Sequence, residues 1–126
     1  MNFKILYDKA LTVAKERTLS PTAVAGSVGA AILTDKNNLY TGVCIDTACS
    51  MGFCAEHAAA AAMITAGEHQ IIKMIAVRYD GTIVSPCGRC REFISQLHIN
   101  NMLCEVKISE TTVKKLSELL PNDWKS

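Results

Sequence analysis

The sequence predicts an α/β fold in which a mixed β-sheet is covered by helices. Helical and strand-like patterns alternate along the chain in the order αββαβαβα, which favours strands that share one sheet with helices packed on it. Hydrophobic residues make up 49% of the 126 residues, which is enough apolar side chain for a core. The chain has no linker-like stretch and no internal repeat. We therefore expect a single domain over residues 1–126.

The first half of the chain predicts a helix followed by a β-hairpin. Apolar residues recur at helical spacing near the start, so one helix face carries Phe3, Leu6, Tyr7, Ala10, Leu11 and Ala14. Residues 28–34 and 39–45 have the composition of strands, and the turn-like residues 35–38 join them. Because the connection is short, we expect the two strands to pair as a hairpin.

The second half alternates helix and strand. An alanine-rich run predicts a helix over 54–66, which Gly67 ends, and Pro86 precedes a second helix over 87–97. The other elements that we expect are strands at 74–78 and 102–108 and a last helix at 112–120.

Composition argues against nucleic acid and membrane partners. The net charge is +1 and charged residues make up 20% of the chain, without the basic stripe that a nucleic acid polymer requires. No apolar run approaches the length that spans a bilayer, and the first residues lack an apolar signal region. Cysteines in such a chain, two of them spaced C-x-x-C, indicate metal or redox chemistry rather than disulfides. We expect a cytoplasmic protein that acts on a small molecule.

Two short cysteine motifs carry the chemistry. Cys54-Ala55-Glu56 is followed by the string PCGRC, in which Cys87 lies 33 positions after Cys54 and Cys90 comes last. Each motif is expected at a helix start, where unpaired N–H groups carry partial positive charge and lower the pKa of a thiol. Catalytic zinc typically takes three protein ligands, whereas structural zinc takes four. We assign Cys54, Cys87 and Cys90 as candidate zinc ligands and Glu56 as the proton carrier.

A zinc site with a carboxylate beside it predicts hydrolysis. Zinc lowers the pKa of a water molecule toward neutrality, and the carboxylate takes the proton. The deprotonated water can attack an electron-poor amidine carbon, such as C4 of cytosine. Glu56 then delivers protons to the ring nitrogen and to the departing amine. On a substrate of this kind ammonia leaves and a carbonyl remains, so the reaction is a hydrolytic deamination.

The strings CAE and PCGRC resemble the cytidine deaminase family in its small, tetrameric form with three cysteine ligands. The resemblance extends over most of the chain, to Val28-Gly29-Ala30-Ala31, Thr41-Gly42 and Glu118-Leu119-Leu120-Pro121. It implies that Cys54, Cys87 and Cys90 bind Zn²⁺ and that Glu56 is the proton shuttle. It also implies a three-layer fold, a nucleoside-like substrate such as cytidine or deoxycytidine, and a homotetramer in which neighbouring chains complete each active site.

Basic residues near the motifs depart from the usual family pattern. Typical members have Arg directly after CAE, where this chain has His57. Zinc with three thiolates is a monoanion, so nearby positive charge is needed to draw electron density off the sulfurs. We expect Arg89, inside the second motif, to supply it, an exchange that blasticidin S deaminase also makes. Arg91 matches the family Arg that follows the motif. The alternative for both arginines is a solvated helix surface.

The residues expected to bind the substrate are altered. Members of the family carry an Asn-x-Glu segment for the ribose hydroxyls, where this chain has Cys44-Ile45-Asp46. The family's aromatic residue over the pyrimidine falls on Gly26 or Ser27. We assign Cys44, Asp46 and Ala55 as candidate substrate-binding residues. Because a lost hydrogen-bond partner discriminates strongly between substrates, we expect cytidine to be a poorer substrate than for a typical member. An unusual nucleoside, a blasticidin-like antibiotic and a free aminated heterocycle remain alternatives.

Two other classes of function compete with a deaminase. A dithiol oxidoreductase could use Cys87 and Cys90, because C-x-x-C at a helix start is also a redox arrangement. That interpretation leaves Cys54 and Glu56 without a role. A non-catalytic zinc-stabilised module would need a fourth ligand, for which Cys49 is the candidate.

Simpler roles are expected for the remaining residues of chemical interest. Cys44, Cys49 and Cys104 are expected to be small structural residues, and His69 and His98 to lie at the surface. Trp124 is expected either to close a neighbour's pocket, as aromatic residues near the C-terminus do in this family, or simply to pack.

Overall fold

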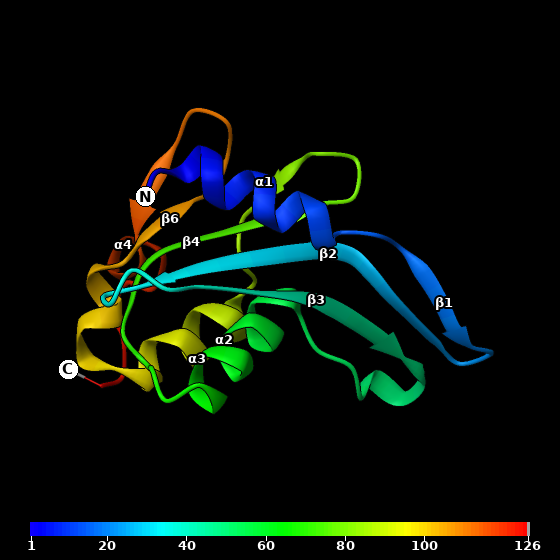
Figure 1. Ribbon diagram of the computed structural model, residues 1–126. Coiled ribbons are helices and arrows are strands. Elements are labelled where there is room, and N and C mark those ends of the chain that lie inside the picture. Colours follow the sequence, from blue (N-terminus) through cyan, green and yellow to red (C-terminus); the bar gives the residue numbers. More distant parts are fainter. Residues whose placement is uncertain (126) are drawn as a thin grey trace.

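The computed structural model describes residues 1–125 and contains a seven-stranded sheet with helices on both faces (Figure 1). Helix α1 (Phe3–Val13) lies on one face, and helices α2 (Ala55–Thr65) and α3 (Gly88–Leu97) lie on the other. The strands are β1 (Arg17–Ser20), β2 (Ala23–Thr34), β3 (Leu39–Thr47), β4 (Ile71–Arg78), β5 (Ile83–Val84), β6 (Glu105–Lys107) and β7 (Val113–Lys115). The short helices are η1 (Ala48–Ser50), η2 (Ile99–Leu103) and α4 (Leu116–Leu119). The predicted α/β fold is confirmed.

The sheet is mixed because one pair of strands is parallel. Its path is β1-β2-β4-β6-β7, with β3 paired to β2 and β5 paired to β4. Strands β4 and β6 are parallel, and the chain crosses between them through α3, as a parallel pair requires. The other pairs are antiparallel, including the expected hairpin of β2 and β3.

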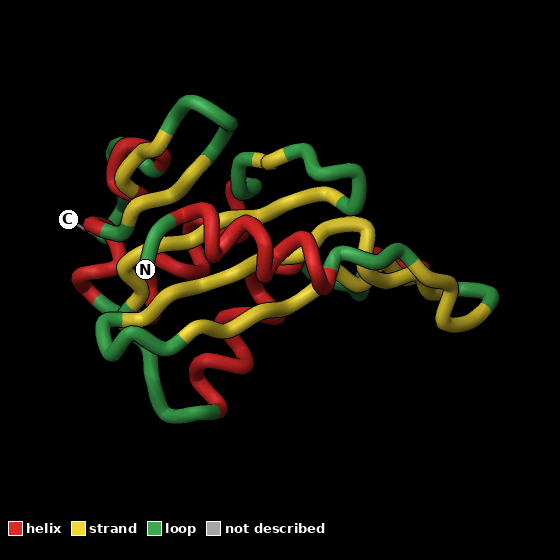
Figure 2. The backbone as a smooth tube through the Cα atoms, turned by 45° about the horizontal axis from the view of Figure 1, so that its top comes forward, coloured by secondary structure: helices red, strands yellow, loops and turns green. Residues whose placement is uncertain are grey.

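Central strand β2 is buried on both faces and so builds two cores. Ala31 and Leu33 pack with Leu6 and Ala10 of α1, which crosses the sheet in the turned view of Figure 2. The alternate residues Ala30 and Ile32 pack on the opposite side, in a larger cluster that includes Ala59, Met63 and Ile94 from α2 and α3. None of the helices within 1–125 combines the length and the apolar character that crossing a bilayer demands.

A projecting hairpin of β1 and the start of β2 was not predicted. It extends away from the body of the molecule (Figure 1), and all four residues of β1 are exposed. Such a strand lacks the alternation of buried and exposed residues that identifies a strand in a sequence. Strand β2 then bulges between Ala25 and Gly29 before it continues along β3. Gly26 has φ +88 in this bulge, and a side chain there would overlap the Lys15 carbonyl.

The C-terminal elements differ from the prediction. Instead of one strand over 102–108, the chain forms η2 and the three-residue strand β6. Instead of a helix over 112–120, residues Val113–Lys115 pair antiparallel with β6, and only the four residues of α4 are helical. A hydrogen bond from the Ile108 amide to the Thr112 carbonyl closes this second hairpin. The segment has a helical pattern, but its pairing with the edge of the sheet decides its conformation. That pairing cannot be seen in the sequence alone.

Helices α2 and α3 begin as predicted, each directly after a cysteine. Cys54 is the N-cap of α2 and Cys87 is the N-cap of α3, both with extended backbone. Helix α2 lies very close to β3, because a Cβ atom at Gly42 would overlap the backbone of Ala58 and Ala59. The absence of a side chain at Gly42 therefore fixes how near the start of α2 lies to the sheet.

Substitution of Gly42 by alanine is expected to destabilise the protein. Because the new methyl group must push α2 away from β3, the free energy of unfolding should fall by about 1–3 kcal/mol, as for an overpacked core. Gly88→Ala is the matched control, since a Cβ atom there meets nothing within 4 Å. Urea unfolding of the two variants measures the difference. Equal stability for both would contradict the close contact of α2 with β3.

Candidate metal centre

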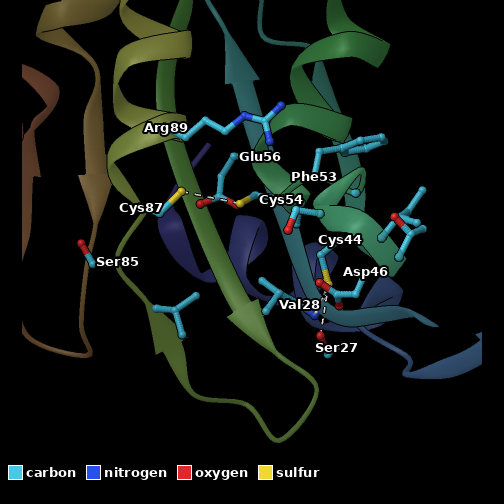
Figure 3. Close-up of a pocket in the computed structure, with 16 residues that line it drawn as sticks. Ser27, Val28, Cys44, Asp46, Phe53, Cys54, Glu56, Ser85, Cys87 and Arg89 are labelled. Carbon is cyan, nitrogen blue, oxygen red and sulfur yellow. Dashed lines mark hydrogen bonds between the residues drawn. The ribbon is translucent and has the colours of Figure 1, made fainter. Parts of the chain in front are cut away.

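Three thiols converge where the starts of α2 and α3 meet. Cys54 and Cys87 are the two N-cap residues, and Cys90 lies one turn into α3. The Sγ atoms of Cys54 and Cys87 are 3.6 Å apart, and those of Cys87 and Cys90 are also 3.6 Å apart (Figure 3). All three sulfurs lie within 4.8 Å of one another, and residues 1–125 contain no other such group of histidine, cysteine or acidic side chains.

The spacing of the sulfurs fits a tetrahedral zinc ion. A Zn–S bond of about 2.3 Å places two sulfurs of a tetrahedral site roughly 3.8 Å apart, close to the 3.6 Å found here. Thiolates are soft donors, which zinc accepts readily. Three sulfurs leave one coordination position open, and Cys54 and Cys87 also line a pocket. The cluster could therefore hold a zinc ion with one face toward that pocket.

The three thiols differ in acidity. Burial raises the pKa of Cys90 well above its ordinary range, and burial together with the neighbouring Cys87 thiol raises the pKa of Cys54 to about 11. At Cys87 burial acts in the same direction, but the nearby Cys90 amide, the other two thiols and the Arg89 amide lower the pKa overall. Cys87 is thus the readiest of the three to form a thiolate, and metal binding at this cluster must release protons.

Glu56 is a buried carboxyl group beside the thiols. It is the second residue of α2, its exposed fraction is 4%, and it lines the same pocket as Cys54 and Cys87. Burial raises its pKa above the ordinary value. A carboxyl group whose pKa moves toward neutrality can both take up and return a proton. Glu56 could therefore act as an acid/base group beside the thiol cluster.

The pocket beside the thiols has a volume of about 580 Å³. Its end opposite the thiols contains Ser27, Cys44 and Asp46 (Figure 3). The Cys44 sulfur accepts a hydrogen bond from the Val28 amide at 3.3 Å and lies 3.1 Å from the Ser27 hydroxyl. The bulge of β2 wraps around Cys44 in this way, and it brings Ser27 to the pocket wall. Asp46 lies 3.9 Å from the Cys44 sulfur, and buried Ala55 lines the pocket between Cys54 and Glu56.

A tight loop forms another wall of the pocket. Cys49 and Ser50 both have positive φ, and Phe53 then pairs with Ile45 through two backbone hydrogen bonds of 2.9 and 3.0 Å. Phe53 lines the pocket, a role that the sequence did not indicate. Cys49 is exposed and lies outside the thiol cluster, so the structural role expected for a buried cysteine does not apply to it.

The three basic residues near the motifs have different surroundings. Arg89 lines the pocket and reaches from α3 toward α2 above Glu56 in Figure 3, without a hydrogen-bond or ion-pair partner in the described part of the chain. Arg91 donates hydrogen bonds to the Pro86 carbonyl, the Leu119 carbonyl and the Ser85 hydroxyl. Arg91 therefore supports the segment that precedes Cys87 rather than the sulfurs themselves.

His57 lies against the third thiol. Its Nδ1 atom is 3.4 Å from the Cys90 sulfur, and its ring stacks on Phe93 of α3. Burial and the charge of Arg89 lower the pKa of His57. Phe93 was not singled out from the sequence, since an apolar residue in a helix gives no sign of the ring that it will contact.

The C-terminal aromatic residue lies away from the pocket. Trp124 is 71% exposed, and its indole N–H donates to Glu92 at 2.9 Å. His69 and His98 contact each other, with ring centroids 5.1 Å apart. Cys104 is buried in the larger core, as expected of a structural cysteine.

Comparisons with known proteins agree on one family. Residues 3–106 match the family model described as the cytidine and deoxycytidylate deaminase zinc-binding region. The chain is 37% identical over 95 residues to the cytidine deaminase of Sporosarcina psychrophila, covering 71% of this chain and 70% of that protein. It is 28% identical over 97 residues to the cytidine deaminase of Mycobacterium tuberculosis, covering 76% and 71%.

Solved structures of the same kind share the fold. The crystal structure of the Mycobacterium tuberculosis cytidine deaminase superposes with a TM-score of 0.83 at 24% identity and covers 98% of both chains. The structure of the cytidine deaminase from Burkholderia pseudomallei superposes with a TM-score of 0.79 at 22% identity and covers 98% of this chain and 100% of that one.

Arg91 and Arg89 are expected to differ in their effect on stability. Because Arg91→Ala leaves two backbone carbonyls without their donor, the free energy of unfolding should fall by about 1–3 kcal/mol. The matched variant Arg89→Ala removes an exposed side chain and should change it by less than about 0.5 kcal/mol. Urea unfolding at one fixed zinc concentration compares them. A larger loss for Arg89→Ala would contradict the supporting role given to Arg91.

Proposed function

Since the chain belongs to the cytidine and deoxycytidylate deaminase family, we propose that it is a zinc-dependent hydrolase that deaminates a cytosine nucleoside. The observation that carries this function is the buried carboxyl group of Glu56 beside three converging thiols in one pocket. The products of the reaction are ammonia and the corresponding uracil nucleoside.

Cys54, Cys87 and Cys90 are the proposed zinc ligands. Their spacing and soft donor atoms fit zinc, and no fourth ligand joins them among residues 1–125. Zinc supplies the Lewis acidity that brings the pKa of a water molecule toward neutrality. Held by these three thiols, the ion would lie in the same pocket as Glu56, so the carboxyl group could receive a proton from such a water.

Glu56 moves the protons. Its carboxylate takes a proton from the attacking water as the C–O bond forms at C4 of the cytosine. It passes that proton to ring nitrogen N3, and a second proton from the added oxygen to the amine, whose C–N bond then breaks. One water molecule is consumed and one ammonia is released. A carboxyl group with a raised pKa suits this exchange, because it can serve as base and then as acid near neutral pH.

The far end of the pocket is the proposed sugar-binding end. Cys44 and Asp46 lie on its walls, and Ser27 adds a hydroxyl group, whereas Ala55 lines the pocket beside Cys54 and Glu56. The only cation on the pocket wall within residues 1–125 is Arg89, which lies at the thiol end. An uncharged sugar therefore suits the far end better than a phosphate does. No feature of the pocket favours a blasticidin-type compound over a cytosine nucleoside.

The rival functions leave part of the site without a purpose. A thiol oxidoreductase would use Cys87 and Cys90 alone, although Cys54 and Glu56 converge on the same point. A closed structural zinc site would need a fourth ligand, and the exposed Cys49 lies outside the cluster. A three-ligand hydrolytic site uses all four residues.

We also propose that the protein is cytoplasmic and acts as a homotetramer. Phe53 on the pocket wall is 38% exposed, and Met51, two residues before it in the same loop, is 80% exposed. Apolar side chains grouped at the rim of a site favour cover by another chain. A second subunit in that place would also exclude water from the pocket.

Replacement of Glu56 by glutamine is expected to stop the reaction without removing the metal. The amide keeps the size of the side chain but cannot exchange protons, so kcat should fall about 100-fold or more. The zinc content of the variant should match that of the wild type. The exposed Glu16→Gln variant is the control and should keep full activity. Activity retained in Glu56→Gln, or zinc lost with the activity, would contradict the proton-carrier role.

Restoring the family's sugar-binding segment is expected to improve turnover of cytidine. The double variant Cys44→Asn, Asp46→Glu should raise kcat/KM for cytidine by about 10-fold or more, because a site discriminates between substrates by the hydrogen bonds that it offers them. Steady-state kinetics on cytidine, deoxycytidine and blasticidin S would compare it with the wild type and with the exposed control Asp35→Glu. Ordinary efficiency of the wild type on cytidine, with no gain in the double variant, would show that this segment does not limit the reaction.

The assembly can be measured directly. Light scattering of the purified protein should report about four chains per particle, the closed symmetric form proposed here. Activity per chain should fall on dilution to concentrations at which the particles dissociate. A fully active monomer would argue against completion of the site by neighbouring chains.

A further inference from the structure

The three thiols of the cluster do not share the same polar neighbours. Cys87 is the N-cap of α3, and the amide groups of Arg89 and Cys90 at the start of that helix lower its pKa. Cys90 has an exposed fraction of 0%, and the nitrogen atom in contact with its sulfur is Nδ1 of His57, at 3.4 Å. A buried thiolate needs a donor more than an exposed one does, because water cannot solvate it.

The imidazole ring of His57 is held in one orientation. His57 is the third residue of α2, and its ring stacks on Phe93 of α3, with centroids 4.2 Å apart and planes inclined by 11°. The stack spans the two helices that carry the thiols. The stack fixes the plane of the ring, and within that plane the Nδ1 edge faces the Cys90 sulfur.

We propose that His57 is a positioning residue that donates a hydrogen bond from Nδ1–H to the Cys90 thiolate. A thiolate that binds a metal carries no proton, so in this pair only the nitrogen can donate. Both the neutral Nδ1–H tautomer and the imidazolium have that proton, so the interaction does not depend on the charge of the ring. This inference rests on the zinc site of the proposed function.

The hydrogen bond would moderate the charge that three thiolates place on one metal. Hydrogen bonds to a ligand sulfur withdraw electron density from it, and partners of this kind affect metal affinity or activity by about 10–100-fold. Arg89 can act only through its charge across the pocket, whereas His57 touches a sulfur. The stack on Phe93 fixes the plane in which the His57 ring meets the Cys90 sulfur.

Cobalt substitution tests the hydrogen bond by a readout other than activity. Co²⁺ bound to thiolates absorbs through sulfur-to-metal charge transfer, and loss of a donor to sulfur shifts that band to lower energy. His57→Phe keeps a ring against Phe93 but removes the donor, whereas His57→Asn places an amide N–H where Nδ1 was and removes the ring. We expect a red shift and an approximately 10-fold loss of kcat in His57→Phe, with a smaller shift in His57→Asn.

His69→Phe is the matched control, since this exposed histidine lies away from the thiols, and it should leave the band unchanged. An unshifted band in His57→Phe, or a larger shift in His57→Asn, would overturn the proposal.

The zinc-loaded wild type gives a test that needs no variant. The imidazole ¹⁵N spectrum should place a proton on Nδ1 of His57, and an unprotonated Nδ1 would refute it. Absence of one bound metal per chain would instead refute the proposed function.

Discussion

The site depends on the meeting of two helix starts on one face of the sheet. Helices α2 and α3 lie together on that face, and their N-cap residues are Cys54 and Cys87. Gly42 allows α2 to lie directly on β3, while Arg91 bonds the segment before α3 through Pro86 and Ser85. A shift of either helix would separate sulfurs that are now 3.6 Å apart. The positions of the sulfurs are thus set by how α2 packs on the sheet and how Arg91 holds the segment before α3.

Several groups that can carry negative charge lie close together at this meeting point, so neighbouring groups must offset that charge. Three thiols and the carboxyl group of Glu56 lie together there. Burial raises the pKa of Glu56, Cys54 and Cys90, while Cys87 is exposed. The amide groups that open α3 favour charge at Cys87, and His57 contacts Cys90. Arg89 adds a full positive charge at the pocket wall. The two sulfurs of the second motif therefore have different polar neighbours.

The sequence predicted the metal end of the site better than the substrate end. The starts of α2 and α3 follow from local signals, namely an alanine-rich run after Cys54 and a proline before Cys87, so their cysteines could be placed without tertiary information. The walls of the pocket depend on contacts between distant segments. The β2 bulge that brings Ser27 to Cys44, and the loop that brings Phe53 back to Ile45, leave no periodic pattern in the sequence. The strand β7 was predicted as helix for the same reason, because its pairing with β6 decides its conformation.

X-ray absorption at the zinc edge of the purified protein tests the central claim most directly, since the account requires three sulfur ligands and one open position. It predicts three sulfurs at about 2.3 Å and one oxygen or nitrogen at about 2.0 Å. In Cys54→Ser one sulfur should be lost from that shell, together with much of the bound zinc. Four sulfur ligands would identify a closed structural site and contradict a hydrolytic role, and protein purified without chelators that contains no zinc would contradict the account altogether.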